Sequence, residues 1–231
     1  MCGISGIVSR DMEHPLPSEW IEGMMNVQAH RGPDDACFLR MPGCLLGFNR
    51  LSILDVSPKG RQPMAAEDSG SALVFNGEIY NYLELAEDLK AKGARFKSRS
   101  DSEVLLAGLE AHSESYLNSL NGMFAFAFYR PRKGELLAAR DRFGVKPLYY
   151  YVDGHFFCFA SEIKALLSLP FITRSPNLAT LFGSVFERRN DRSEETSFKD
   201  IQQLRPSHWL KLKRDSWKLE LGKYFSLDGL E

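Results

Sequence analysis

The sequence predicts a single α+β domain built on packed β-sheets, and three observations lead to this class. Many short strand-like segments occur along the 231 residues, with a few helical segments grouped between them. In residues 123–129, phenylalanines alternate with small or apolar residues, so both faces of that segment are apolar. Such a strand is typical of a sheet covered on both sides. No shift in composition marks an internal domain boundary.

The strands are predicted from apolar runs that end at turn residues. Residues 2–8 form a short β-rich run with small residues on either side of the isoleucines, which indicates a strand buried on both faces. Further strands are predicted at residues 44–48, 71–75, 123–129, 136–139, 148–151 and 156–160. Residues 204–212 and 217–221 are expected to form a last hairpin.

Helices are predicted where apolar residues recur with helical spacing behind a capping residue. Ser18 is the expected N-cap of a helix over residues 18–29. Asn81 and Ser100 are each followed three residues later by a glutamate, a capping-box pattern that starts two more helices. Gly93 is expected to end the first of these two. A helix at 161–169 and a charged loop at 188–195 complete the prediction.

Composition and charge exclude several classes of protein. The 29 Lys and Arg residues balance 30 Asp and Glu residues, whereas nucleic-acid binding relies on clustered basic surface. No stretch reaches the roughly 18 apolar residues of a membrane helix, and the N-terminus lacks the pattern of a signal peptide. We therefore expect a cytoplasmic protein that binds neither nucleic acid nor membrane.

Cys2 stands out among the four cysteines because only an initiator methionine precedes it. The cysteines are too scattered for a disulfide framework, and the histidines show no metal-ligand spacing, so no metal is expected. A thiol with a pKa of about 8.5 needs a base, which the α-amino group of Cys2 supplies if Met1 is removed. The alternative is a small buried cysteine in an edge strand.

Three other positions each allow a structural and a functional interpretation. Asn76 and Gly77 follow a predicted strand, where they form either a hairpin turn or an oxyanion hole. Asp101 lies in the first turn of a helix, where the dipole favours a carboxylate, and is otherwise an anchor for a substrate ammonium. Arg50 ends an apolar strand as a surface ion-pair residue or as a carboxylate clamp.

Ordered blocks along most of the chain carry a family resemblance. They are residues 1–6 (MCGISG), 30–34 (HRGPD), 49–55 (NRLSILD), 62–64 (QPM), 75–81 (FNGEIYN), 100–103 (SDSE), 120–126 (LNGMFAF), 140–149 (RDRFGVKPLY) and 160–165 (ASEIKA). Through them the sequence resembles the glutaminase domain of class II glutamine amidotransferases, which are N-terminal-nucleophile (Ntn) hydrolases. It is most similar to that of the glutamine-hydrolysing asparagine synthetases, from residue 1 to about 225.

The resemblance implies a fold and a reaction. The fold is a four-layer αββα sandwich of two antiparallel sheets. One glutamine amidotransferase type 2 domain is expected at residues 2–225, with residues 226–231 beginning a linker. In the implied reaction, Cys2 attacks the side-chain amide of L-glutamine and releases ammonia, and water hydrolyses the γ-glutamyl thioester to glutamate.

The resemblance also implies roles for the candidate residues. The Asn76 side chain and the Gly77 backbone would hold the tetrahedral oxyanion. Arg50 would bind the α-carboxylate of glutamine, and Asp101, helped by Glu78, its α-ammonium. The same pocket would be lined by Leu51, Ser52, Ile53 and Leu54.

The expected partner beyond L-glutamine is a C-terminal synthetase domain that receives the ammonia and amidates aspartate. ATP and magnesium are expected only in that domain, and no cofactor in this one. One alternative is the same glutaminase serving another acceptor, such as a sugar carboxylate. Another is a non-catalytic regulatory or dimerisation module, and a homodimer is left open.

Overall fold

The computed structural model describes residues 1–12, 15–51, 60–186 and 194–227. The strands are β1 (Gly3–Ser9), β2 (Asp35–Met41), β3 (Cys44–Arg50), β4 (Met64–Ala65), β5 (Ala72–Ile79), β6 (Gly122–Arg130), β7 (Glu135–Arg140), β8 (Tyr149–Val152), β9 (Phe156–Ala160), β10 (Ile201–Gln203), β11 (His208–Lys213) and β12 (Lys218–Lys223). The α-helices are α1 (Ser18–Val27), α2 (Tyr82–Ala91), α3 (Asp101–His112), α4 (Ile163–Leu166) and α5 (Leu178–Phe186). None of the helices within these ranges is long and apolar enough to cross a membrane.

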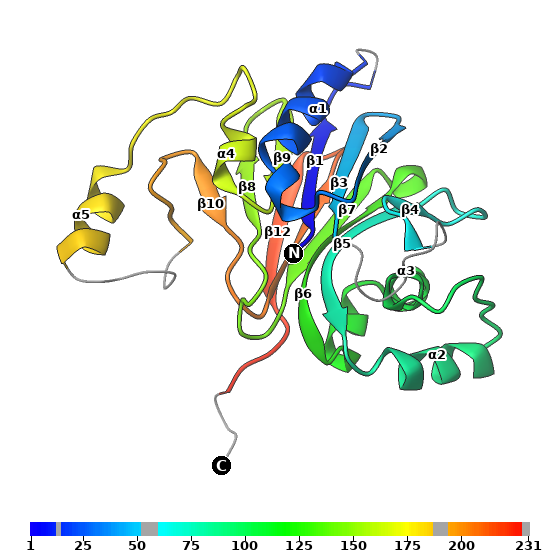
Figure 1. The fold of residues 1–231 in the computed structure, drawn as a ribbon. Helices are drawn as coiled ribbons and strands as arrows, with labels where there is room; N and C mark the ends of the chain where they lie inside the picture. The colour runs from blue at the N-terminus through cyan, green and yellow to red at the C-terminus, as the bar shows by residue number, and fades with distance from the viewer. Residues whose placement is uncertain (13–14, 52–59, 187–193, 228–231) are drawn as a thin grey trace.

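The strands form two antiparallel sheets of six strands each (Figure 1). The first sheet has the order β10-β8-β9-β1-β3-β2, and the second has the order β12-β11-β7-β6-β5-β4. In the first sheet, β1 lies between β3 and β9, where Ile4 pairs with Phe48 and Ile7 with Cys158. The N-terminal strand is therefore an internal strand of its sheet, and Cys2 directly precedes it.

Strand β6 shows why its sequence is apolar on both faces. Ala125, Ala127 and Tyr129 point into the core between the two sheets. Phe124, Phe126 and Phe128 point the other way, into a second core. Because successive side chains of a strand alternate between faces, two alanines and a tyrosine face the inner core and three phenylalanines face the outer one.

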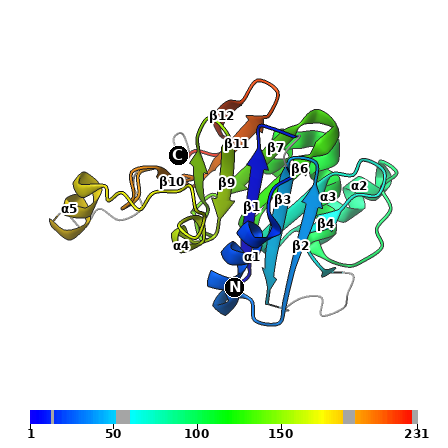
Figure 2. The same ribbon diagram turned by 90° about the horizontal axis from the view of Figure 1, so that it is seen from above.

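Helices cover the outer face of each sheet, which gives the four layers. On the first sheet, α1 and α4 pack over Ile7, Leu45 and Cys158 (Figure 2). On the second, α2 and α3 bury the outer phenylalanines of β6. The αββα sandwich of two antiparallel sheets is thus confirmed. Both views show α5 standing away from the sandwich (Figures 1 and 2).

One of the three predicted helix caps is confirmed. The Ser100 hydroxyl accepts a hydrogen bond from the Glu103 backbone N–H. Asn81 does not cap α2, because its side chain instead bonds the backbones of Ser119 and Asn121. Ser18 is the first residue of α1, behind Pro17 at the N-cap position, which makes no side-chain cap bond.

Several element predictions need correction. The strand expected at 71–75 continues to Ile79, since β6 offers pairing partners along its whole length. The helix expected at 161–169 has helical hydrogen bonding over Ile163–Leu166 alone. The strand expected from residue 204 begins at His208, after a turn in which Ser207 has a φ of 65°. Strand β2 and helix α5 were not predicted. Most of the predicted charged loop at 188–195 lies outside the described residues.

The core predicts a large effect of truncating Phe126, which is fully buried under α2 and α3. Phe126→Ala should lower the free energy of unfolding by about 3–5 kcal/mol, because it removes the ring's contacts and leaves a cavity. Urea denaturation measures this. As a control, Leu83→Ala on the exposed face of α2, where Leu83 is 62% exposed, should change stability by less than about 0.5 kcal/mol. Equal effects of the two substitutions would contradict the assigned core.

Candidate active site

Cys2 lies immediately before β1, at the end where β1 pairs with the last residues of β3. Gly3 is opposite Asn49, so Cys2 lies beside the segment that leaves β3. The Cys2 Sγ–H donates to the carbonyl oxygen of Leu51 at 3.6 Å, and the Leu51 N–H donates to Sγ at 3.4 Å. Burial raises the pKa of the Cys2 thiol, while the Leu51 N–H and nearby positive charges oppose the rise.

Asn76, Gly77 and Glu78 are strand residues of β5, so the hairpin-turn interpretation of Asn76-Gly77 is wrong. Gly77 is opposite Phe124 in the ladder with β6. A Cβ atom at Gly77 would lie 2.1 Å from the Met123 carbonyl oxygen, so the close approach of β6 requires glycine here. The Asn76 side chain is buried, and its Nδ2 has no hydrogen-bond partner in the described part of the chain.

Asp101 begins α3 and is 5% exposed. Its Oδ2 accepts the Ile79 N–H at 3.0 Å, and its Oδ1 accepts the Ser102 hydroxyl at 3.4 Å. Burial raises the pKa of the Asp101 carboxyl, and the neighbouring Glu78 carboxylate adds to the rise against these hydrogen bonds. The site thus holds a buried acid that forms no ion pair within the part of the chain that the structure describes.

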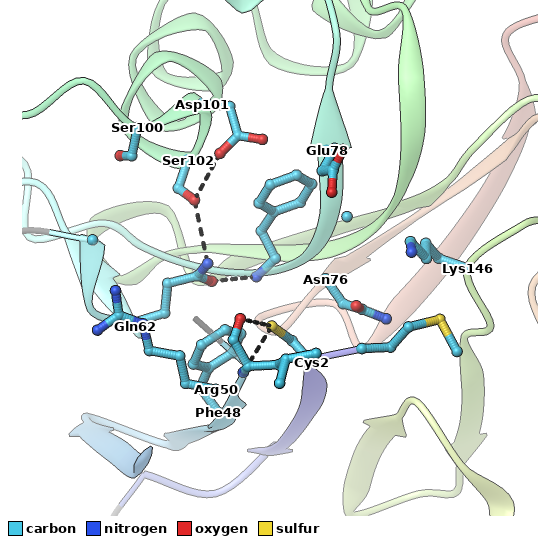
Figure 3. Close-up of a pocket in the computed structure, with 15 residues that line it drawn as sticks. Cys2, Phe48, Arg50, Gln62, Asn76, Glu78, Ser100, Asp101, Ser102 and Lys146 are labelled. Carbon is cyan, nitrogen blue, oxygen red and sulfur yellow. Dashed lines mark hydrogen bonds between the residues drawn. The ribbon is translucent and has the colours of Figure 1, made fainter. Parts of the chain in front are cut away.

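One pocket brings together residues from six parts of the sequence. Of the predicted site residues it is lined by Cys2, Arg50, Leu51, Asn76, Gly77, Glu78 and Asp101. Figure 3 shows Cys2 and Asn76 at one end of the pocket and Asp101 at the other. Glu78 lies between these two ends, on β5. The predicted lining residues Ser52, Ile53 and Leu54 lie outside the described residues.

The pocket also contains residues to which the sequence analysis gave no role. Gln62 is buried, accepts the Phe75 N–H at 2.6 Å and donates to the Ser102 hydroxyl at 3.3 Å, so it joins β5 to α3. Lys146 lines the pocket from the loop between β7 and β8. The signal for both was their place inside the blocks at 62–64 and 140–149. Their local sequence alone gives no reason to place them beside Cys2.

Arg31 holds the backbone of Cys2 from outside the pocket. Its Nε–H donates to the Cys2 carbonyl oxygen at 3.0 Å, and its Nη1 donates to Glu162 at 3.0 Å. Despite partial burial, hydrogen bonds from Arg31, Lys164 and His30 hold the pKa of Glu162 below its usual value. Gly32 makes this possible, since a Cβ there would lie 2.4 Å from the Asn49 backbone. The block at 30–34 therefore fixes the position of Cys2.

The arrangement suits nucleophilic chemistry on a small ligand with charged groups. It offers a thiol, a buried amide donor beside it, and both an acid and a guanidinium for the ligand's charges. Within the described ranges, no group of three or more His, Cys, Asp or Glu residues could hold a metal ion.

Comparison with known proteins shows which family the chain resembles. A family profile described as "Glutamine amidotransferase domain" matches residues 1–225. Asparagine synthetase [glutamine-hydrolyzing] 3 of Bacillus subtilis is 36% identical over 231 residues, covering 99% of this chain and 37% of that protein. Asparagine synthetase [glutamine-hydrolyzing] 1 of the same organism is 44% identical over 172 residues, covering 72% of this chain and 27% of that protein. The chain thus spans about a third of the length of these relatives.

Among solved structures, the glutamine phosphoribosylpyrophosphate amidotransferase from B. subtilis superposes with a TM-score of 0.71 at 18% identity. The match covers 98% of this chain and 50% of that one. At this identity the likeness concerns the fold alone.

The raised pKa of Asp101 predicts a pH dependence of stability in the protein without ligand. The folded protein holds the Asp101 proton more tightly than the unfolded chain, whose aspartate pKa is about 3.9. Raising the pH from about 4 through the folded-state pKa therefore favours unfolding at this site. Urea unfolding of wild type and Asp101→Asn between pH 4 and 7 should show wild type losing stability relative to the variant as pH rises. A relative gain with pH would contradict the assignment.

Proposed function

Because the chain belongs to the family of glutamine amidotransferase domains, we propose that it hydrolyses L-glutamine to glutamate and ammonia with Cys2 as the nucleophile. The observation that carries this proposal is the single pocket lined by Cys2, Asn76, Gly77, Arg50 and Asp101. Its thiol and its acid lie at opposite ends, as an extended amino acid with an amide at one end requires.

The nucleophile needs a base, since burial raises the pKa of the Cys2 thiol. No histidine lines the described part of the pocket. Removal of Met1 would turn the peptide nitrogen of Cys2 into an α-amino group, whose ordinary pKa of about 7.7–8.0 is close to working pH. Met1 is 54% exposed, which supports its accessibility to processing. Nucleophile and base then belong to the same residue.

The oxyanion hole would be made by β5. The buried Nδ2 of Asn76 has hydrogens to donate and no acceptor in the described part of the chain. Leaving a buried donor unpaired costs about 1–3 kcal/mol, a cost that an acceptor from the substrate would remove. An amide nitrogen fixed in a strand beside the thiol, together with the Gly77 N–H, would stabilise a tetrahedral oxyanion before it forms.

The charged ends of glutamine would be recognised by Asp101 and Arg50. A substrate ammonium beside Asp101 and Glu78 would offset the burial of the acid, which otherwise raises its pKa. Arg50, buried at the end of β3, has the planar fork that matches an α-carboxylate. A ligand that lacks the ammonium would leave the buried Asp101 carboxyl without a cation, which would make the site selective for ligands with a free amino group.

The proposed reaction has two halves. The Cys2 sulfur forms a bond to the side-chain carbonyl carbon, and its proton passes to the α-amino group. The carbon–nitrogen bond then breaks, and that proton leaves with the amide nitrogen as ammonia. Water attacks the thioester in the second half, which releases glutamate and restores the thiol.

The ammonia would pass to a synthetase region outside this chain, where an acid is amidated. The names of two relatives, asparagine synthetases described as glutamine-hydrolysing, support aspartate as the acceptor. ATP and magnesium would act in that region. The acceptor depends on residues beyond the third of the relatives' length that this chain spans.

Substitution of the nucleophile tests the reaction. Cys2→Ala should lower glutamate and ammonia release from glutamine by about 10³-fold or more, since the bond-forming atom is gone. Its thermal unfolding should match wild type. Cys37→Ala is the matched control, because Cys37 is exposed on β2 and does not itself line the pocket, and it should keep full activity. Hydrolysis at the wild-type rate by Cys2→Ala would rule out Cys2 as the nucleophile.

Processing of Met1 gives a second prediction. Intact-mass measurement should show that active protein lacks one methionine residue. A leucine inserted between Met1 and Cys2 should block processing, because the new second residue is bulky, and should abolish hydrolysis while the thiol is still present. Full activity in protein that retains Met1 would rule out the α-amino group as the base.

A further inference from the structure

Lys146 is a buried cation that the proposed reaction does not use. It is 6% exposed and lines the same pocket as Cys2. Within the described ranges, its ammonium group makes no hydrogen bond or ion pair, although its backbone makes two hydrogen bonds. Buried lysines are normally paired, because an isolated ammonium in a low-dielectric site loses solvation. A group that bears negative charge during the reaction would supply the missing partner.

The backbone of Lys146 is fixed by a buried acid and a buried arginine. The Asp141 carboxylate accepts backbone N–H groups from Phe124, Phe143, Val145 and Lys146 at 2.9–3.2 Å. Arg140 donates to the carbonyl oxygens of Lys146, Leu204 and Gly144 at 2.7–2.8 Å. Gly144 permits the turn with a φ of 68°. The loop that presents Lys146 is therefore held from both sides.

The ammonium lies at the Cys2 end of the pocket. Figure 3 shows Lys146 on the same side as Asn76 and away from Asp101. Met1, whose carbonyl carbon is bonded to the Cys2 nitrogen, lines the same pocket. Burial raises the pKa of the Cys2 thiol, and the Leu51 N–H, the N-terminus, Lys146 and Arg31 act against that rise, in this order.

Other charges face these groups from neighbouring elements. Arg31 reaches the Cys2 carbonyl, and Arg50 lines the pocket from β3. Glu78 and Asp101 are the carboxylates of the pocket, and Asp101 lies at its far end. Behind Lys146, the carboxylate of Asp141 already accepts four N–H groups. Among the described residues that line the pocket, Lys146 is thus the lysine, and it lies at the Cys2 end.

We propose that Lys146 is a positioning residue for glutamine hydrolysis, whose buried ammonium favours the thiolate of Cys2 and the uncharged form of its α-amino group. The inference rests on the proposed function, since it assumes Cys2 as the nucleophile. A fixed positive charge stabilises a nearby anion and disfavours a second cation, so both effects act in the direction that nucleophile and base require. No proton or bond of the reaction passes through Lys146 itself.

The test measures how the reactivity of Cys2 depends on pH. Wild type, Lys146→Met, Lys146→Gln and Lys146→Arg are alkylated with iodoacetamide between pH 5 and 10, and the rate is followed at each cysteine by peptide mass spectrometry. In Lys146→Met and Lys146→Gln, the pH profile of Cys2 alkylation should move to higher pH by about one unit. In Lys146→Arg, the profile should return most of the way to that of wild type, because the positive charge is kept. Cys37, exposed on β2, is the internal reference, and its profile should not move.

Steady-state hydrolysis of glutamine provides a second measurement. The acidic limb of the pH profile of kcat/KM should also move to higher pH in the neutral variants. Their kcat/KM should be about tenfold lower than that of wild type at pH values on the acidic limb, and less reduced at higher pH. Lys92→Met, which removes an exposed lysine at the end of α2, should leave both profiles unchanged.

Specific outcomes would overturn the proposal. An unmoved Cys2 profile in well-folded neutral variants would do so, as would loss of the fold in both neutral variants with retention in Lys146→Arg, which assigns the lysine to stability. The alkylation measurement does not depend on turnover. If the wild-type protein does not hydrolyse glutamine, the proposed function is wrong. The pH profile of Cys2 alkylation would still show whether Lys146 affects the Cys2 thiol.

Discussion

The contact between the inner faces of the two sheets is the interaction on which the rest of the molecule depends. Alanines of β6 and β7 on one side meet isoleucine, leucine and phenylalanine side chains of β1, β3 and β9 on the other. Cys2 comes from the end of β1 and Asn76 from β5, so they meet because the sheets pack face to face. Burial of apolar area across this contact thus sets the geometry of the site. Arg31 and Gln62 then refine it locally, one at the backbone of Cys2 and the other between β5 and α3.

The buried polar groups of the loop that presents Lys146 and those of the pocket differ in how they are paired. Asp141 and Arg140 have their polar atoms occupied by backbone groups, so they stabilise a loop without remaining demand for a ligand. The Asn76 Nδ2 is buried without such a partner in the described residues, and burial raises the pKa of Asp101. Groups left unpaired lower stability in the empty protein. A ligand that pairs with these groups removes the unfavourable free energy of leaving them unpaired, and this gain contributes to binding. Unpaired buried groups are therefore expected at a functional site.

Particular elements show how far sequence reasoning reached. The alternation in residues 123–129 correctly predicted a strand that is apolar on both faces, and each face packs in a different core. Ser100 caps its helix as expected. Asn81 has an equally good capping pattern, yet its side chain bonds a neighbouring turn, because tertiary partners were available to it. The Asn76-Gly77 pair, the commonest hairpin signal, lies inside a strand because β6 pairs with it along its full length. Local pattern determined an element where no long-range partner competed.

For the site, the sequence determined the chemical types and, through the ordered blocks, the family. Cys2, Arg50, Asn76 and Asp101 were identified from type, position and resemblance, and they do line one pocket. Their order from end to end of that pocket was decided only by tertiary structure, since it depends on sheet packing and strand register. Gln62, Arg31 and Lys146 gained their places in the same way, because their partners lie far away in the sequence. Residue type fixes which charge or hydrogen bond a side chain offers, whereas the fold decides whether that group is satisfied within the protein or left for a ligand.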